Sequence, residues 1–228
     1  MLLRLEDVSK DFDGRSVLEH VHLDVAVGEW VGFIGPNGGG KTTLLNVISR
    51  LIAPSSGHVV FDGEDITRRS PSDLQELAIA RVFQQPYFNH RIPVLENVAL
   101  GVRRAKASPA LPMTAARLAL DAVGFSLSAV DTQRRVDRFQ SRLIELARVL
   151  VARPRLVLLD EPAAGFDSDE RARLKVALNV LRRTGTAVIL VEHDHHLVGD
   201  LCDRLVSVRD GRLATSEESR SGQELSRA

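Results

Sequence analysis

The sequence of residues 35–43 is Gly35-Pro36-Asn37-Gly38-Gly39-Gly40-Lys41-Thr42-Thr43, which fits the pattern G-x-x-x-x-G-K-S/T. An apolar run from Val31 to Ile34 precedes it and predicts a buried strand, and the residues after it predict a helix that begins near Lys41. In such a loop several backbone N–H groups converge on a β-phosphate, Lys41 bridges the β- and γ-phosphates, and the Thr42 hydroxyl can bind Mg²⁺. The helix dipole favours the same anion. Because a glycine-rich linker would not need these flanking elements, we predict that residues 35–43 bind a nucleotide.

The composition favours one globular unit with a subdomain. The chain has 228 residues, of which 44% are hydrophobic, enough for a sizeable core. Basic and acidic residues balance at 30 each and no basic stretch stands out, so we expect no nucleic-acid partner. No run approaches the ~20 apolar residues that span a bilayer, and the N-terminus lacks the pattern of a secretion signal. The single cysteine, Cys202, excludes an internal disulfide and a cysteine metal cluster, and we expect it to pack as a small apolar side chain.

Hydrophobic patterns place strands and helices along the chain. Alternating apolar residues on both sides of the Asp13-Gly14 turn predict an antiparallel start, and a helical pattern runs from Val94 to about Leu150. Short apolar runs then alternate with helices, which favours a parallel sheet covered on both faces. The expected strands are Leu2–Val8, Leu23–Val27, His58–Asp62, Leu156–Leu159 and Ala187–Val191, with a closing hairpin at Asp210-Gly211; the clearest helices are Ala115–Val123, Leu143–Leu150 and Ser168–Arg183.

Two carboxylates, Asp160 and Glu161, follow the apolar strand Leu156–Leu159. In open α/β sheets the carboxyl ends of the strands carry the ligand. Asp160 can therefore reach the Mg²⁺ shell, and Glu161 is placed to polarise a water for in-line attack on a γ-phosphate. Alone, such a pair is equally well explained as helix capping. Together with the phosphate loop, it indicates a nucleotide hydrolase.

The chain resembles the ATP-binding-cassette (ABC) ATPases over nearly its whole length. Its motifs occur in the order found in that family: residues 35–43, Phe83-Gln84, Leu158-Leu159-Asp160-Glu161-Pro162, Ala164-Gly165-Phe166-Asp167 and Val191-Glu192-His193-Asp194. The resemblance implies an α/β P-loop NTPase fold with a mostly parallel sheet, an antiparallel N-terminal β subdomain and a helical subdomain. We expect a single ABC ATPase domain over 1–228, with the RecA-like core and β subdomain in 1–87 and 151–215, the helical subdomain in about 88–150, and a loose tail in 216–228.

The resemblance also implies roles for single residues. Phe12, on the early hairpin, would stack on adenine. Gln84 would sense Mg²⁺ and the attacking water and couple to the membrane partner. His193 would hydrogen-bond the γ-phosphate, and Asp167 would lie at a dimer interface. Two alternatives stay open: Phe12 as a core residue, and His193 as part of a metal cluster with the histidines just after it, although no second ligand group of the right type lies nearby in sequence.

Several short stretches of the sequence are similar to the ATPases of branched-chain amino acid and urea uptake systems, although this chain is shorter in the helical segment. The stretches that carry this likeness are Gly32–Asn37, Asp62–Ile66, Ala80–Gln84, Glu161–Gly165 and Glu192–Asp194. The likeness implies an importer subunit for amino acids or a small polar amide solute, with Mg²⁺ as the cofactor. It would bind transmembrane permease subunits as a peripheral protein on the cytoplasmic face of the inner (cell) membrane, and act indirectly with a solute-binding protein.

One segment departs from the family. The signature loop, normally Leu-Ser-Gly-Gly-Gln, falls here on Val136-Asp137-Arg138-Phe139-Gln140, so only the glutamine matches. In the family this loop binds the γ-phosphate held by the other subunit, through its serine hydroxyl and glycine N–H groups. Asp137 would place a carboxylate against that phosphate, and Arg138 and Phe139 forbid the close backbone approach that glycine permits. Arg138 can offset part of the charge, but a productive hydrogen-bonding cradle is hard to build.

Three functions are therefore open. We favour an active ATPase subunit of a membrane importer that works beside a second, different ABC ATPase with an intact signature loop. A non-transport ABC protein acting on DNA or ribosomes would need a basic surface, tandem cassettes or a long coiled coil. A regulatory subunit that binds ATP without hydrolysing it is disfavoured, because Gln84, Glu161 and His193 are retained.

Overall fold

The computed structural model describes residues 1–102, 110–127 and 136–215, and the expected tail at 216–228 lies outside these ranges. The larger of its two sheets has the strand order β10-β9-β3-β8-β7-β6, and neighbouring strands are parallel except β9 and β10. The predicted strands after residues 155 and 186 and the closing hairpin are confirmed. The strands of this sheet are β3 (Trp30–Ile34), β6 (Ile79–Val82), β7 (Leu156–Asp160), β8 (Ala187–Val191), β9 (Arg204–Arg209) and β10 (Arg212–Thr215).

The smaller sheet is antiparallel and has the order β2-β1-β4-β5. The predicted turn at Asp13-Gly14 is confirmed, and both residues have positive φ, 48° and 82°. The hairpin strands are longer than their sequence pattern predicts, because β-bulges shift the register between them and interrupt the apolar alternation. The strands of this sheet are β1 (Leu3–Phe12), β2 (Arg15–Val25), β4 (Ser56–Phe61) and β5 (Glu64–Asp65).

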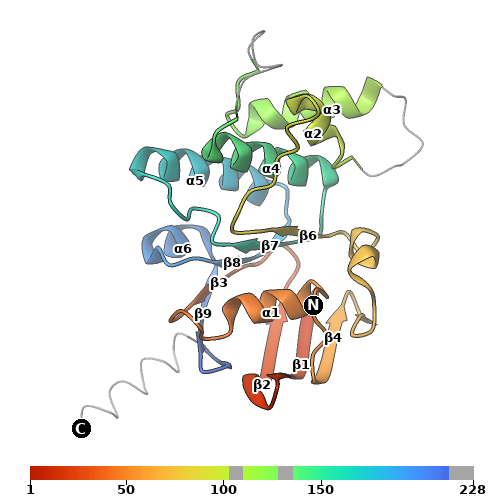
Figure 1. Cartoon of the computed structure of the whole chain (residues 1–228), viewed down its shortest axis with the longest axis vertical. Helices are drawn as coiled ribbons and strands as arrows, with labels where there is room; N and C mark the ends of the chain where they lie inside the picture. The colour runs from red at the N-terminus through yellow and green to blue at the C-terminus, as the bar shows by residue number, and fades with distance from the viewer. Residues whose placement is uncertain (103–109, 128–135, 216–228) are drawn as a thin grey trace.

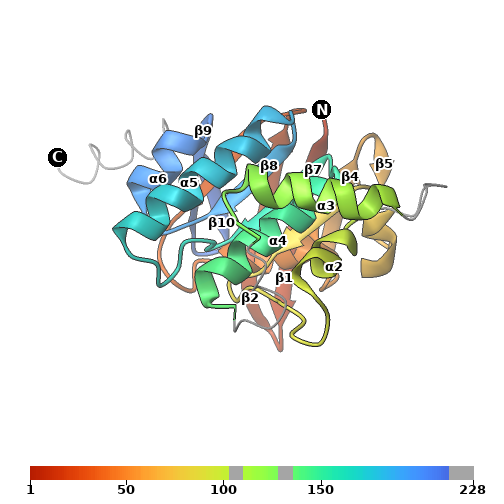
Figure 2. The ribbon, with the colours of Figure 1, turned by 90° about the horizontal axis from the view of Figure 1, so that it is seen from above.

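Helices cover both faces of the larger sheet. Figure 1 shows α2 to α5 above this sheet and α1 below it, between the larger sheet and strands β1 and β2, and Figure 2 shows α3 to α5 from above. The expected α/β fold, with a mostly parallel sheet, an antiparallel N-terminal part and a helical part, is confirmed. The helices are α1 (Lys41–Ile48), α2 (Val94–Ala99), α3 (Ala110–Ala122), α4 (Arg138–Ala152), α5 (Ser168–Arg183) and α6 (His195–Leu201), and Pro71–Gln75 form a 3₁₀ turn.

The strands of the larger sheet contribute to two hydrophobic cores. In β7, Val157 and Leu159 pack in the core that contains α2 to α6, whereas Leu156 and Leu158 pack in the core that contains α1 and the smaller sheet. All four side chains are fully buried. A strand buried on both faces needs a continuous apolar run rather than an alternating one, which is the pattern seen before Asp160. The two cores therefore hold the end of β7 that carries the predicted carboxylates.

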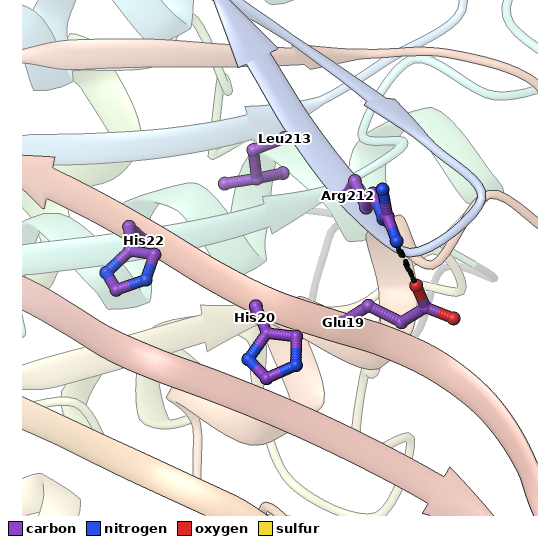
Figure 3. Close-up of a pocket in the computed structure, with 5 residues that line it drawn as sticks. All are labelled: Glu19, His20, His22, Arg212 and Leu213. Carbon is purple, nitrogen blue, oxygen red and sulfur yellow. Dashed lines mark hydrogen bonds and ion pairs between the residues drawn. The ribbon is translucent and has the colours of Figure 1, made fainter.

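The two sheets meet where β2 passes β10. The Glu19 carboxylate accepts hydrogen bonds from Nε and Nη2 of Arg212 at 3.1 and 2.9 Å, and the Glu19 backbone N–H donates to the Gly211 carbonyl at 2.9 Å. Figure 3 shows this ion pair beside His20, His22 and Leu213, and the five side chains line a pocket of about 360 Å³. None of the predicted site residues lines this pocket.

Cys202 packs against the core as a small apolar side chain, as predicted. A Cβ built on Gly32 of β3 would lie 3.1 Å from its Sγ, and burial raises the pKa of the thiol to about 12. Because the thiolate is the reacting species, alkylation by iodoacetamide at pH 8 is expected to be at least ~100-fold slower in the folded chain than in the denatured chain. Equal rates in the two states would contradict this placement.

Candidate active site

The phosphate loop joins β3 to α1, as the sequence predicts. Gly35 has a φ of 145°, and a Cβ at this position would lie 2.1 Å from the carbonyl oxygen of Val208 on β9, so only glycine fits. Gly40 is the N-cap of α1 in the left-handed conformation, with a φ of 103°. No side chain caps α1 and its first turn contains no acidic residue. The N-terminal N–H groups of this helix are therefore arranged as in sites that bind phosphate.

Lys41 is the first residue of α1, and its side chain folds back over the phosphate loop. Its Nζ donates to the carbonyl oxygens of Gly35 and Pro36, both at 2.8 Å. These bonds use two of the three ammonium donors. Burial lowers the pKa of Lys41, while the charges of Glu161 and Asp160 act in the opposite direction. The loop thus holds a positive charge close to the two predicted carboxylates.

Three predicted catalytic residues meet at the carboxylate of Glu161. Its Oε2 accepts a hydrogen bond from Nε2 of Gln84 at 2.6 Å, and its Oε1 lies 2.9 Å from Nε2 of His193. Gln84, Glu161 and His193 follow β6, β7 and β8, which are neighbours in the sheet, and the carboxyl ends of parallel strands lie at one edge. Each oxygen of a carboxylate has a further lone pair. Glu161 can therefore also accept a hydrogen bond from a water, as a general base requires.

The backbone around Glu161 is strained and held by a second carboxylate. Glu161 has a φ of 44°, which is uncommon for a residue other than glycine, and its N–H donates to the Val191 carbonyl at 2.8 Å. Glu192 is buried, and its carboxylate accepts from the backbone N–H groups of Ala163 at 2.6 Å and His193 at 3.1 Å. Burial raises the pKa of Glu192. Glu192 is a site residue without a role predicted from the sequence, although a carboxylate at the end of an entirely apolar strand is a usable signal.

Asp160 lies beside Thr42, and both can supply oxygen ligands to Mg²⁺. Burial raises the pKa of Asp160, while the neighbouring Thr42 side chain acts in the opposite direction. A hydroxyl and a carboxylate are the hard oxygen donors that Mg²⁺ prefers, so these residues fit the expected ion. Gln84, the third predicted metal residue, contacts Glu161 through its amide nitrogen, which leaves its amide oxygen as the ligand atom.

Arg81 is also part of this site, although the sequence pattern does not predict it. Its Nη2 donates to Oδ2 of Asp160 at 2.7 Å, and the two side chains are only 8% and 7% exposed. The guanidinium also lies over the ring of Phe83, 5.3 Å from the centroid. Removing one partner of a buried pair costs much more than an exposed pair is worth, so this contact fixes the Asp160 carboxylate. A lone arginine inside the short strand β6 is the signal that was available.

The degenerate signature loop begins α4 and is capped by its own aspartate. Asp137 is the N-cap, and its carboxylate accepts from the N–H of Gln140 at 2.7 Å. In return, Oε1 of Gln140 accepts from the N–H of Asp137 at 3.2 Å, which completes a capping box. The Asp137 carboxylate therefore accepts a hydrogen bond at the N-terminus of α4, at the position where the family resemblance implies a phosphate.

The other residues of the loop pack on the segment 164–167 or on the core. Phe139 is buried, and its ring meets that of Phe166 edge to face at 5.3 Å between centroids. The guanidinium of Arg138 lies 5.9 Å from the Phe166 ring and so close to Gly165 that a Cβ there would be 2.6 Å from Nη1. Val136 is half-buried against the core of α2 to α6. These contacts occupy the space that two glycines would leave open.

Phe12 and Asp167 lie at the surface. Phe12 is 44% exposed at the end of β1, so the alternative of a core residue is wrong. The adjoining β2 reaches the phosphate loop, since a Cβ built on Gly40 would lie 3.0 Å from the carbonyl oxygen of Val17. Asp167 is the N-cap of α5 and accepts from the N–H of Glu170 at 2.9 Å. Their roles in adenine stacking and dimerisation stay predictions.

The described residues offer neither a metal cluster nor a membrane span. No group of three or more histidine, cysteine, aspartate or glutamate side chains among them is placed to hold a metal ion, so the alternative explanation of His193 has no support there. Every helix in the described ranges is too short or too polar to cross a bilayer.

The comparison with known proteins decides the family. Residues 18–164 match the ABC transporter family. The chain belongs to this family. The aliphatic sulfonates import ATP-binding protein of Cupriavidus necator is 35% identical over 216 residues, which are 94% of this cassette and 68% of that protein. A ribose import ATP-binding protein of Streptomyces avermitilis is 30% identical over 220 residues, which are 95% of this cassette and 44% of that protein, so the cassette spans less than half of this relative.

Solved structures agree with this assignment. The ABC cassette is similar to the dimeric, post-hydrolysis ATP-binding cassette MJ0796 bound to ADP and phosphate, with a TM-score of 0.81 and 26% identity over 94% of this chain and 98% of that chain. The two relatives named above are import proteins for aliphatic sulfonates and ribose. The comparisons therefore place the chain in the ABC transporter family, and its role in import and the likeness to amino acid and urea uptake systems stay predictions.

Proposed function

We propose that this ABC cassette binds Mg²⁺ and ATP at residues 35–43 and hydrolyses the γ-phosphate as the ATPase subunit of a membrane importer. The convergence of Gln84 and His193 on the Glu161 carboxylate carries this proposal. A protein that only bound nucleotide would need the phosphate loop but not an oriented carboxylate at the edge of the sheet. The regulatory alternative is disfavoured for that reason.

Each residue of the site has a separate task in the proposed reaction. Lys41 and the first N–H groups of α1 bind the phosphate oxygens, and Glu161 accepts a proton from, or orients, the attacking water. Gln84 and His193 hold the two carboxylate oxygens of Glu161, so that the remaining lone pairs of these oxygens point towards the attacking water. Thr42, Asp160 and the amide oxygen of Gln84 would hold Mg²⁺, which neutralises charge on the β- and γ-phosphates when bound.

The proposed assembly is a heterodimer of two different ABC ATPases. Asp137 caps α4 and Phe139 is packed on Phe166, so the loop at 136–140 is poorly suited to a nucleotide held by another subunit. We propose that the partner ATPase supplies an intact signature loop to the phosphate site of this chain, with Asp167 at the interface. The dimeric structure of the similar cassette MJ0796 supports pairing as such.

The remaining parts of the proposal rest on the resemblance to importer ATPases. The chain would form one ABC ATPase domain with a helical subdomain at about 88–150, and would bind transmembrane permease subunits at the cytoplasmic face of the membrane. A solute-binding protein would act with the complex indirectly. The finer likeness favours amino acids or a small polar amide as the solute. Identifying the polypeptides that copurify with the chain from membranes tests these assignments.

Nucleotide binding is tested with Lys41→Ala. Because Lys41 supplies the ammonium at the phosphate loop, its loss is expected to weaken ATP binding more than tenfold, or ~1.4 kcal/mol. The matched control is Lys175→Ala on α5, where the lysine pairs with Asp200, and its Kd for ATP is expected to match that of the parental chain. Titration with ATP in the presence of Mg²⁺ measures both. An unchanged Kd in Lys41→Ala would overturn the assignment of the loop.

A further inference from the structure

Arg142 of α4 is buried, and its guanidinium is hydrogen-bonded to the backbone of Phe83 and Gln84. Its side chain is 1% exposed. Nη1 donates to the carbonyl oxygen of Phe83 at 2.8 Å, and Nη2 donates to the carbonyl oxygen of Gln84 at 2.7 Å. Nη1 also donates to Oε2 of Glu145, one turn along the helix, at 2.6 Å. One planar side chain therefore binds two consecutive peptide groups and its own counter-ion.

Burying the Arg142 guanidinium is unfavourable for stability unless its hydrogen bonds to the backbone have a role. Burial lowers the pKa of Arg142, and its Nε is buried without a hydrogen-bond partner in the described structure. A buried ion pair is commonly no better for stability than apolar residues of similar volume. Four residues near Arg142 on α4 are apolar and buried, so an apolar side chain would suit the packing of this helix; they are Phe139, Leu143, Ile144 and Leu146. The two bonds to the backbone are what an apolar residue cannot provide.

Besides Arg142, the segment Phe83-Gln84 is held at the Phe83 ring by Arg81, whose guanidinium lies 5.3 Å from the ring centroid. Phe83 follows β6 directly, and its side chain is 45% exposed, so apolar burial does not anchor it well. Gln84 must nevertheless place its Nε2 within 2.6 Å of Glu161. We propose that Arg142 is a positioning residue that fixes the Phe83 and Gln84 peptide groups so that the Gln84 amide reaches Glu161. The kinetic part of this inference rests on the proposed ATPase function.

Arg148 provides a matched control on the same helix. It is a partly buried arginine whose Nε donates to the carbonyl oxygen of Asn97 at 2.9 Å, and whose Nη2 lies 3.4 Å from Oδ1 of the same residue. Arg148 thus ties α4 to α2 through one residue, away from Gln84. A general role of buried arginines in the stability of α4 would make both residues equally important, whereas positioning of Gln84 depends on Arg142 alone.

The first experiment measures the order of the Gln84 segment in the nucleotide-free chain. ¹⁵N relaxation gives order parameters for the backbone amides of Gln84 and Gln85 in the parental chain, Arg142→Lys and Arg148→Lys. Lysine keeps the charge beside Glu145 but lacks the planar fork that places separate donors, Nη1 and Nη2, on the two carbonyls. We expect values near those of rigid backbone, about 0.85, in the parent and in Arg148→Lys, and below about 0.6 in Arg142→Lys. Parental values in Arg142→Lys overturn the inference without bearing on ATP hydrolysis.

The second experiment measures kinetics in the complex that copurifies with the chain. Arg142→Lys is expected to lower kcat at least tenfold and to leave the Kd for ATP within twofold of the parental value. In a Gln84→Ala background the same substitution is expected to change kcat less than twofold, because the contact it supports is already lost. Multiplicative losses in the double variant overturn the inference. If Arg142→Lys does not fold, Arg142→Met with Glu145→Leu replaces it, with the same expected results.

The two hypotheses fail in different ways. A loss of order at Gln84 in Arg142→Lys, in a complex that shows no Glu161-dependent ATP hydrolysis, supports the positioning role and contradicts the proposed function. Parental order in Arg142→Lys, together with Glu161-dependent hydrolysis, contradicts the positioning role and leaves the proposed function in place.

Discussion

Glu161→Gln is expected to lower ATP hydrolysis in the assembled complex by ~10² or more while leaving ATP bound. The substituted side chain keeps the shape of the carboxylate and its contacts with Gln84 and His193, but the amide cannot accept a proton from water. The phosphate loop is unchanged, so the Kd for ATP is expected to stay within about threefold of the parental value. Phosphate release under saturating ATP, with a parallel binding titration, measures both quantities.

A surface glutamate provides the control for this experiment. Glu64 lies on β5, where it forms an exposed ion pair with Arg69, and such pairs contribute little to stability. Glu64→Gln is expected to hydrolyse ATP at the parental rate. If Glu161→Gln also did so, another residue would have to act on the water. If it lost ATP binding instead, Glu161 would belong to the binding site rather than to the hydrolytic step.

The second large effect concerns the purified chain alone. In a head-to-tail homodimer, each phosphate loop would face a loop 136–140 of the other copy, in which the Asp137 carboxylate already accepts from the N–H of Gln140. Loss of one preorganised donor for a developing negative charge typically lowers kcat 10²–10³-fold. The isolated chain is therefore expected to hydrolyse ATP on the order of 100-fold more slowly than the complex, although it still binds ATP.

This prediction is checked by comparing turnover per phosphate site in the two preparations. The concentration of the isolated chain is raised through the range in which cassettes dimerise, so that a weak homodimer is not missed. Fast and cooperative hydrolysis by the isolated chain would contradict the prediction. It would mean that Asp137 and Arg138 form a working substitute for the signature loop.

Sequence patterns predicted the parts of the site that depend on local structure. The glycines of residues 35–43 are required by backbone conformation and by the close approach of Val208, and the strand before them and the helix after them are each encoded in short apolar patterns. Asp160 and Glu161 were found because they directly follow the buried strand β7. Because the carboxyl ends of parallel strands lie at one edge of the sheet, Gln84 and His193 then lie near these two carboxylates.

The contacts that sequence patterns did not predict join residues far apart in the chain. Arg81 pairs with Asp160 across two strands, and Arg142 binds the backbone of Phe83 and Gln84 from α4. Arg81 appears in sequence as the one charge of β6, and Arg142 as one of four charged residues of α4, which is equally typical of a solvated surface. Strand β6 itself was not predicted, because four residues with a central arginine carry too little pattern.

For the signature loop, residues 136–140, one property is predictable from the sequence and another is not. Its departure from the family was clear in the sequence, since a carboxylate and two large side chains replace a serine and two glycines. The capping box of Asp137 with Gln140 and the packing of Phe139 on Phe166 became visible only in three dimensions. They give the substitutions a physical role: the loop stabilises α4 and the segment 164–167 of its own chain.

The central claim is that hydrolysis in the complex takes place at the phosphate loop and Glu161 of this chain. The most direct test is steady-state ATP turnover of two variant complexes, one with Glu161→Gln in this chain and one with the corresponding substitution in the partner ATPase. We predict that the first variant loses nearly all turnover and that the second retains most of it. Equal losses in the two variants, or a larger loss in the partner variant, would contradict it.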